Sequence, residues 1–252
     1  MVIKNSYSII NKENISFDVF LPVIDETFSL EKTIKIIERD CSKFIVNYLI
    51  VVSKSKTKLR SKNIIRKLSL RYKDKIKIII QEKDYIGGAL KSSIKNITSS
   101  HFILMASDLE TNPNDIKKLI ECSIRNPYKI IFTSRWLKKK SFIGYNPLKL
   151  FLNKIFQFLF SKLFKTKITD LTFAYRIYPS KEIKKLKLKE KKHPILLETA
   201  LIPIKLGVSL IELPSKWHFR KEGKTNNTFI RNFSYILTAF RIFFSKKNKL
   251  IR

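Results

Sequence analysis

Two carboxylates, Asp108 and Glu110, directly follow the strand-like run HFILMAS of residues 101–107. A buried strand that delivers carboxylates at its C-terminal tip is where an α/β protein usually keeps its chemistry. Carboxylates two residues apart can hold a hard divalent cation, which can in turn hold a diphosphate. The same stretch also fits the start of a helix, with Asp108 or Asn112 as the N-cap and Pro113 at the first helical position. On this stretch alone, both interpretations stay open.

Four further residues could bring charge to the same site. Arg135 ends a predicted strand, Arg176 lies in a strand-like segment, and Arg220 lies in a polar loop. An arginine guanidinium can bind phosphate through two parallel hydrogen bonds. Asp170 precedes the strand-like segment, where it fits a turn or cap as well as a base. Each of these residues, taken singly, is more often an ordinary surface or turn residue.

A glycine pair, Gly87-Gly88, opens another predicted helix. Such a pair allows close backbone approach and exposes N–H groups suited to phosphate, although it lacks the G-x-G-x-x-G spacing of a dinucleotide site. An ordinary tight turn explains the pair as well. His101, His193 and His218 share no ligand spacing, so a zinc site is not expected. No Ser/His/Asp or Cys/His set indicates nucleophilic catalysis.

Alternating strands and helices are predicted to position these residues. Predicted strands cover residues 17–24, 46–53, 75–80, 101–107 and 129–135, and helices cover residues 29–39, 58–72, 87–98 and 113–125. This alternation is typical of right-handed βαβ units with a buried, parallel sheet. Later elements are a helix over 147–164, a strand-like segment over 169–179, a helix over 194–206, a strand over 208–217 and a helix over 228–244. We therefore expect one α/β domain with a mainly parallel central sheet flanked by helices.

The formal net charge of +32 implies attraction to an anionic partner, such as nucleic acid, an acidic membrane surface or a phosphorylated substrate. Lys, Ile, Asn and Phe are all abundant, however, and an A/T-biased coding sequence would produce the same charge without selection for binding. The basic residues are also spread through the chain rather than clustered. We therefore expect no specific nucleic-acid partner.

The compartment is predicted to be cytoplasmic. Cys41 and Cys122 lie far apart in helical segments, as expected of reduced thiols rather than a disulfide framework. The N-terminus is polar and mixed, unlike a signal peptide, and no apolar stretch reaches the roughly 20 residues of a spanning helix.

The predicted final helix, residues 228–244, gathers aromatic and aliphatic residues on one face and is followed by a basic tail. An aromatic face with a basic flank suits an interfacial helix on an anionic bilayer, here the inner face of the membrane. The same face could instead pack on the protein's own core, and the helix of residues 147–164 presents the same two alternatives. The predicted division is a main domain over residues 1–227 and a C-terminal amphipathic helix with its tail over residues 228–252.

Taken in order, these weak signals resemble one family. From Phe17 to about Asn226, the chain resembles the family 2 glycosyltransferases, closest to the dolichyl-phosphate mannosyltransferase-like branch. Six elements match the family's motifs. Pro22 to Glu26 correspond to P-x-x-N-E, Tyr85 to Leu90 to N-x-G-x-x-x-A-L, and Asp108-Leu109 with Pro113 to D-x-D-L…P. Further along the chain, Ser134-Arg135 correspond to G-S-R, Thr169-Asp170 with Arg176 to T-D…G-F-R, and Glu212 to Pro214 with Arg220, Gly223 and Thr225 to E-v-P…R-x-x-G-x-S-K. Their order and spacing are far more specific than any one element.

This resemblance implies a GT-A-type fold and transfer of a sugar from a UDP- or GDP-sugar to a polyprenyl-phosphate or glycan acceptor. The implied metal ligands for Mg²⁺ or Mn²⁺ are Asp108 and Glu110. The implied donor-binding residues are Pro22, Asp25, Glu26, Lys54, Gly87, Gly88 and Asp108. The residues implied to meet phosphate or acceptor are Ser134, Arg135, Arg176 and Arg220, and the implied catalytic residues are Asp108 and Asp170, the latter as base or orienting group.

The chain departs from the family pattern at acidic positions. Asp25 replaces the family's Asn, Ser53 to Lys56 replace D-D-G-S, Ala106 replaces the first Asp of D-x-D, and Asn226 replaces the terminal Lys. These losses allow a catalytically silent binding protein of the same fold, and a basic nucleic-acid-binding protein is a further alternative. Because Asp108 keeps the metal-binding position and Lys54 and Lys56 can offset part of a diphosphate's charge, we favour an active glycosyltransferase in cell-envelope or polysaccharide synthesis.

Overall fold

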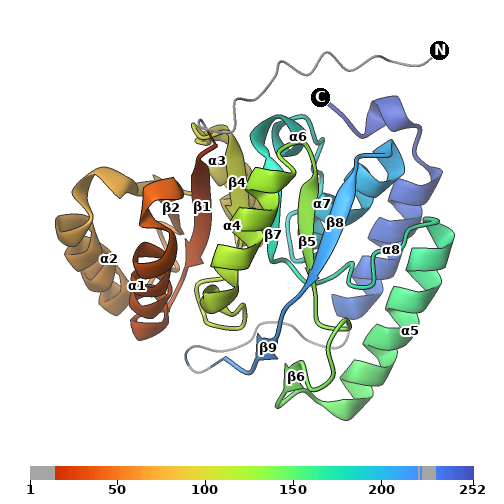
Figure 1. Ribbon diagram of the computed structural model, residues 1–252, viewed down its shortest axis with the longest axis horizontal. Coiled ribbons are helices and arrows are strands. Elements are labelled where there is room, and N and C mark those ends of the chain that lie inside the picture. Colours follow the sequence, from red (N-terminus) through yellow and green to blue (C-terminus); the bar gives the residue numbers. More distant parts are fainter. Residues whose placement is uncertain (1–14, 221, 223–230) are drawn as a thin grey trace.

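The computed structural model describes residues 15–220, 222 and 231–252. Its central feature is a seven-stranded sheet in the order β3-β2-β1-β4-β7-β5-β8 (Figure 1). The strands are β1 (Phe17–Val23), β2 (Ile45–Val52), β3 (Ile76–Ile80), β4 (His101–Leu104), β5 (Ile130–Ser134), β7 (Arg176–Pro179) and β8 (Leu210–Pro214). Two short strands, β6 (Phe142–Ile143) and β9 (Trp217–His218), pair separately.

Helices cover both faces of the sheet. They are α1 (Phe28–Cys41), α2 (Leu59–Arg71), α3 (Tyr85–Lys95), α4 (Ile116–Arg125), α5 (Pro147–Leu163), α6 (Ser180–Lys184), α7 (Pro194–Leu206) and α8 (Arg231–Phe244). One core joins α1, α2 and α4 to one face of the sheet, and Leu30 and Leu119 are fully buried in it. The other core joins α3, α6 and α7 to the opposite face, with Leu90 and Leu197 fully buried. The predicted α/β architecture is confirmed.

The sheet is parallel except at β7, which runs antiparallel to both β4 and β5. The strand predicted over residues 169–179 is shorter than expected, because only Arg176–Pro179 pair with neighbouring strands. The Asp170 carboxylate accepts hydrogen bonds from the N–H groups of Thr172 and Phe173, at 3.3 and 3.1 Å. These groups are consequently not available to a strand ladder.

The C-terminal helix α8 joins the rest of the fold through one face. Ala239 and Ile242 are fully buried against α7, and Arg241 Nη2 lies 2.5 Å from Glu198 Oε1. The expected boundary at residues 227 and 228 lies outside the described residues. Within the described part of the chain, α8 thus packs on the core and also exposes a second face.

Candidate active site

Parallel strands carry the candidate site residues to one edge of the sheet. Because β1, β4, β5 and β8 run in the same direction, their carboxyl ends share that edge, where ligands bind in open α/β sheets. Glu26 follows β1, and Asp108 and Glu110 follow β4. Arg220 follows β9 and reaches the same place, because His218 N–H donates to the Glu110 carbonyl at 3.3 Å. Residues from three distant parts of the sequence thus meet.

Arg220 lies between the two carboxylates. Its Nη2 donates to Asp108 Oδ2 at 2.7 Å, and its Nε donates to Glu110 Oε1 at 2.8 Å. Glu110 N–H donates to Asp108 Oδ1 at 3.0 Å, and Trp217 Nε1 lies 3.4 Å from Glu110 Oε2. Leu109 between the carboxylates has a φ of 64°, which a bulky residue rarely adopts. Strain of this kind is concentrated at functional sites.

Burial sets the electrostatics of this site. Burial, together with the Glu110 carboxylate, raises the pKa of Asp108 to about 7, against the opposing charge of Arg220. Glu26 is close enough to add to this effect. Burial also raises the pKa of Glu26, although the N–H groups of Ile24 and Asp25, at 2.7 and 3.1 Å, stabilise its carboxylate. The site concentrates negative charge around one guanidinium.

The two carboxylates fit a magnesium or manganese ion. Their oxygens converge on one positive group, and hard divalent cations prefer carboxylate oxygens. Among residues 15–220, 222 and 231–252, no group of three or more His, Cys, Asp or Glu is arranged to hold a metal. Magnesium in nucleotide sites commonly takes one or two carboxylates and completes its shell with substrate phosphates and water. Asp108 and Glu110 match that pattern.

The segment that carries Arg220 also carries the carboxylate of Glu222, which binds the N-terminus of α1. Glu222 accepts hydrogen bonds from the N–H groups of Thr27 and Ser29, at 2.9 and 3.2 Å, and from both of their hydroxyls. A helix N-terminus favours negative charge. Arg220 and Glu222 therefore attach one segment to two sides of the candidate site.

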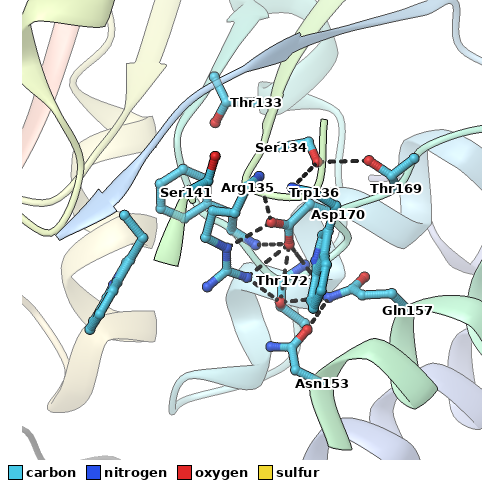
Figure 2. Close-up of polar contacts among 12 residues, drawn as sticks. Thr133, Ser134, Arg135, Trp136, Ser141, Asn153, Gln157, Thr169, Asp170 and Thr172 are labelled. Atoms are coloured by element: carbon cyan, nitrogen blue, oxygen red, sulfur yellow. Dashed lines mark hydrogen bonds and ion pairs between the residues drawn. The ribbon is translucent and has the colours of Figure 1, made fainter. Parts of the chain in front are cut away.

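Arg135 and Asp170 form a buried ion pair instead of an open phosphate site. Figure 2 shows the Arg135 guanidinium pointing at the Asp170 carboxylate, with Nε–Oδ2 and Nη2–Oδ1 distances of 2.7 and 2.9 Å. Thr172 and Gln157 of α5 extend the same network, since Gln157 Nε2 donates to Thr172 Oγ1 at 2.9 Å. Ser134 Oγ is held by Thr169 Oγ1 at 2.7 Å. The Asp170 carboxylate is fully buried and already bound by protein donors, and its role as base or orienting group stays a prediction.

Arg176 is also placed away from the site. Its side chain is fully buried, with Nη1 donating to the Leu196 carbonyl and to Thr199 Oγ1, both at 2.9 Å. Its Nη2 donates to the Leu171 carbonyl at 2.9 Å, and the guanidinium lies over the Phe132 ring. Carbonyls of the core already bind Arg176, and its phosphate contact stays a prediction.

The glycine pair serves packing instead of phosphate binding. Gly87 N–H donates to the Lys191 carbonyl at 2.8 Å, so it is not available to a ligand. A Cβ at Gly88 would lie 1.6 Å from the Lys83 carbonyl oxygen, and one at Gly87 would lie 2.6 Å from that of Glu190. The described geometry gives both glycines a role in the close packing of α3 against two loops, and their donor contact stays a prediction.

Gly88→Ala is expected to lower the free energy of unfolding by roughly 1–3 kcal/mol, because the backbone must move to admit the methyl group. Urea denaturation followed by circular dichroism would measure the change. Gly207, where an added Cβ meets nothing within 4 Å, provides the comparison through Gly207→Asn, since Asn tolerates the left-handed φ of 81° found there. Equal stability of Gly88→Ala and the wild type would contradict this packing role.

The other predicted donor residues lie near the same edge. Pro22, the second-last residue of β1, is half-buried, and its carbonyl accepts a hydrogen bond from Ser107 Oγ, which ties the tips of β1 and β4 together. Asp25 is half-buried beside Glu26, and Lys54 is exposed after β2. The structure therefore brings Pro22, Asp25 and Glu26 toward the carboxylate pair.

Several residues of the site had no sequence signal. Trp217 and Glu222 depend on the fold of a late segment, and Glu222 contacts residues 195 positions earlier. An aromatic row also borders the site, with ring-centroid separations of 4.6 to 6.3 Å between successive members. Its members are Trp136, Phe142, Tyr145, Trp217 and Phe219. Only their spatial contiguity distinguishes them from scattered aromatic residues.

Solved structures with this fold include glucosyl-3-phosphoglycerate synthase from Mycobacterium tuberculosis. Its complex with Mn²⁺, UDP and phosphoglyceric acid gives a TM-score of 0.70 at 12% identity, covering 93% of this chain and 81% of that chain. Its complex with Mg²⁺ and UDP gives a TM-score of 0.70 at 13% identity, covering 92% of this chain and 80% of that chain. These similarities show a shared fold.

Sequence comparison identifies the family itself. The family model described as Glycosyl transferase family 2 matches residues 18–186, more than half of the chain. The match includes Asp108, Glu110 and the strands that carry them, in agreement with the resemblance of the motifs. The chain therefore belongs to glycosyl transferase family 2.

Proposed function

We propose that this glycosyltransferase moves a sugar from a nucleoside diphosphate donor, with Mg²⁺ or Mn²⁺, to a polyprenyl phosphate or a glycan. The reaction would serve cell-envelope or polysaccharide synthesis, and the lipid-phosphate acceptor follows the resemblance to the dolichyl-phosphate mannosyltransferase-like branch of the family. The observation that carries the proposal is the convergence of Asp108 and Glu110 on one positive group at the carboxyl edge of the sheet. The structurally similar synthase binds UDP with Mn²⁺ or Mg²⁺, which supports the same class of ligand here.

The role that we propose for each site residue follows from its position and its charge. A bound divalent cation would neutralise charge on the diphosphate leaving group, and Asp108 and Glu110 would hold it. Arg220 would donate to phosphate oxygens, since its guanidinium already lies at the carboxylate pair. Pro22 and the pre-oriented Glu26 would contact the base or ribose, with Lys54 and Asp25 at the rim.

The acceptor oxygen would attack the anomeric carbon while the bond to the diphosphate oxygen breaks. A phosphate acceptor is already anionic, so this step requires no strong base. A reaction that needs no strong base agrees with the burial of Asp170 in an ion pair with Arg135. In this mechanism Asp170 is a positioning residue, because it fixes the loop between α5 and β7.

Isothermal titration with a panel of UDP- and GDP-sugars, with and without Mn²⁺, tests the donor class. We expect at least one donor to bind only when Mn²⁺ is present and to be turned over with release of its nucleoside diphosphate. Binding without turnover, across a panel of acceptors, would favour a silent member of the family. Failure of every donor to bind would contradict the proposed activity, and steeply salt-dependent binding to DNA or RNA would favour the nucleic-acid alternative.

An exposed apolar face supports a membrane acceptor. Helices α5 and α8 lie side by side, since Phe156 contacts Tyr235 and Phe160 contacts Phe240 with centroids 6.5 and 5.7 Å apart (Figure 1). We define the α5/α8 face by its exposed apolar residues, which are Leu148, Phe151, Ile155, Phe158, Leu159, Phe233, Leu237, Phe240 and Phe244. Exposed lysines lie on the same helix α5 or shortly after α5 and α8, namely Lys149, Lys154, Lys162, Lys165, Lys246 and Lys247. Exposed apolar residues with neighbouring basic residues suit the surface of an anionic bilayer.

No helix within the described residues is both long and apolar enough to cross a membrane. The association that we propose through the α5/α8 face is peripheral, on the inner face of the membrane.

The double variant Phe151→Ser/Phe158→Ser is expected to lose most flotation with phosphatidylglycerol-containing vesicles, because it removes two side chains that are 61% and 59% exposed. Vesicle flotation assays on the full chain measure this effect. Leu59→Ser/Leu70→Ser on α2 is the matched control, since these leucines are 73% and 68% exposed but lie on another helix, away from the α5/α8 face. Flotation of the α5 variant at the wild-type level would reject this face as the membrane contact.

A further inference from the structure

The guanidinium of Arg220 lies between Asp108 and Glu110, the two residues that would hold a divalent cation. It contacts one oxygen of each carboxylate, at 2.7 and 2.8 Å. The other oxygen of each carboxylate faces another donor. Glu110 N–H donates to Asp108 Oδ1, and Trp217 Nε1 lies near Glu110 Oε2. A metal ion bound between these carboxylates would therefore lie against the positive charge of Arg220, and close like charges repel strongly at a partly buried site. The two cations compete for one place.

Glu222 strengthens this arrangement from the opposite side. Its carboxylate accepts four hydrogen bonds from Thr27 and Ser29 at the start of α1. Arg220 and Glu222 lie two positions apart in the sequence, so the contact of one restricts the movement of the other. Together they form a two-point contact, to the tip of β4 and to α1.

We propose that Arg220 is the resident counter-cation of the carboxylate pair, and that it exchanges with the divalent cation when a diphosphate binds. Without ligand, Arg220 offsets part of the negative charge of the pair and disfavours binding of the metal alone. A diphosphate offers Arg220 a new anionic partner, so Arg220 leaves the carboxylates as the metal enters. Metal and diphosphate thus bind cooperatively, each raising the affinity of the other by the same factor. The diphosphate half of this inference rests on the proposed donor, whereas the competition between Arg220 and metal does not.

Titration of Mn²⁺ alone, with free Mn²⁺ followed by electron paramagnetic resonance, tests the competition. We expect Arg220→Gln to bind Mn²⁺ roughly tenfold more tightly than the wild type, within the range of ordinary coupling between sites. Lys216→Gln is the matched control, because it removes one exposed positive charge from the same segment without touching the two carboxylates in the described structure, and it should leave the affinity unchanged. An unchanged or weaker Mn²⁺ affinity in Arg220→Gln overturns the proposal, as does equal tightening in Lys216→Gln.

Arg220→Lys provides a second test should the first variant fail to fold. A lysine ammonium lacks the planar fork that contacts both carboxylates at once, so we expect a smaller tightening than in Arg220→Gln. Weaker Mn²⁺ binding in a folded Arg220→Lys protein than in the wild type would overturn the exchange. Melting curves on each variant establish that the fold is retained.

Repeating the titration with UDP separates this inference from the proposed donor. In the wild type, UDP should raise the Mn²⁺ affinity by about tenfold or more, and in Arg220→Gln the same addition should have a smaller effect. If UDP and GDP fail to bind any protein while Arg220→Gln still tightens Mn²⁺ binding, the donor class is wrong and the competition stands. If both nucleotides bind with the same Mn²⁺ coupling in wild type and variant, the exchange of Arg220 is wrong and the donor class stands.

Discussion

Asp108→Asn is expected to abolish metal-dependent donor binding and to lower kcat/KM by at least about 100-fold. The substitution removes the anionic oxygen that faces the cation position, while the shape of the side chain and its acceptor for Glu110 N–H are kept. Asp108 is the more buried of the two carboxylates, so an exposed side chain cannot readily take its place as a metal ligand. Calorimetry with Mn²⁺ and the best donor, followed by a UDP-release assay, measures both effects.

Asp115→Asn is the matched control for this variant. Asp115 also follows β4, but it pairs with Lys118 at 2.7 Å and accepts from Ser215 at 2.6 Å, away from Arg220. We expect it to keep donor affinity and metal dependence. Unchanged Mn²⁺ dependence in Asp108→Asn would disprove the assignment of the metal site to this carboxylate.

The parallel strands and the tip of β4 could be predicted because their signals are local. Apolar runs such as 46–53 mark strands buried on both faces, and parallel strands bring their carboxyl ends together whatever follows. Asp108 and Glu110 were therefore placed correctly relative to the sheet. The antiparallel strand β7 between β4 and β5 had no comparable local signal.

Local sequence did not determine which way the other polar residues point. Arg135 and Arg176 both lie near the active edge, yet each turns into the protein to bind Asp170 or the carbonyls around Leu196. A buried guanidinium requires partners that come from distant segments, and neighbouring residues do not reveal them. The glycine pair is similar, because the carbonyls that exclude a Cβ come from Lys83 and from Glu190 and Lys191.

Asp170→Ala is expected to lower the free energy of unfolding by about 3–5 kcal/mol, the usual effect of removing one partner of a buried ion pair. Asp170 is fully buried and Arg135 is 6% exposed, so the substitution leaves a desolvated guanidinium without its counter-charge. It also removes the acceptor for the N–H groups of Thr172 and Phe173. Urea denaturation of the variant and the wild type measures the difference.

Glu82→Ala is the comparison, since the Glu82–Lys95 pair is exposed on both sides and such pairs contribute at most about 1 kcal/mol. Asp170→Asn then separates a positioning role of Asp170 from a catalytic one.

Asparagine keeps an oxygen acceptor for the loop but has no negative charge. If Asp170 is a positioning residue, the Asp170→Asn variant should lose stability together with any activity that it loses. If Asp170→Asn instead retained full stability and lost turnover at unchanged KM, with activity returning at high pH, Asp170 would act on the acceptor as a base. The buried ion pair with Arg135 would then have to open during the reaction, which the fixed network around Gln157 and Thr172 disfavours.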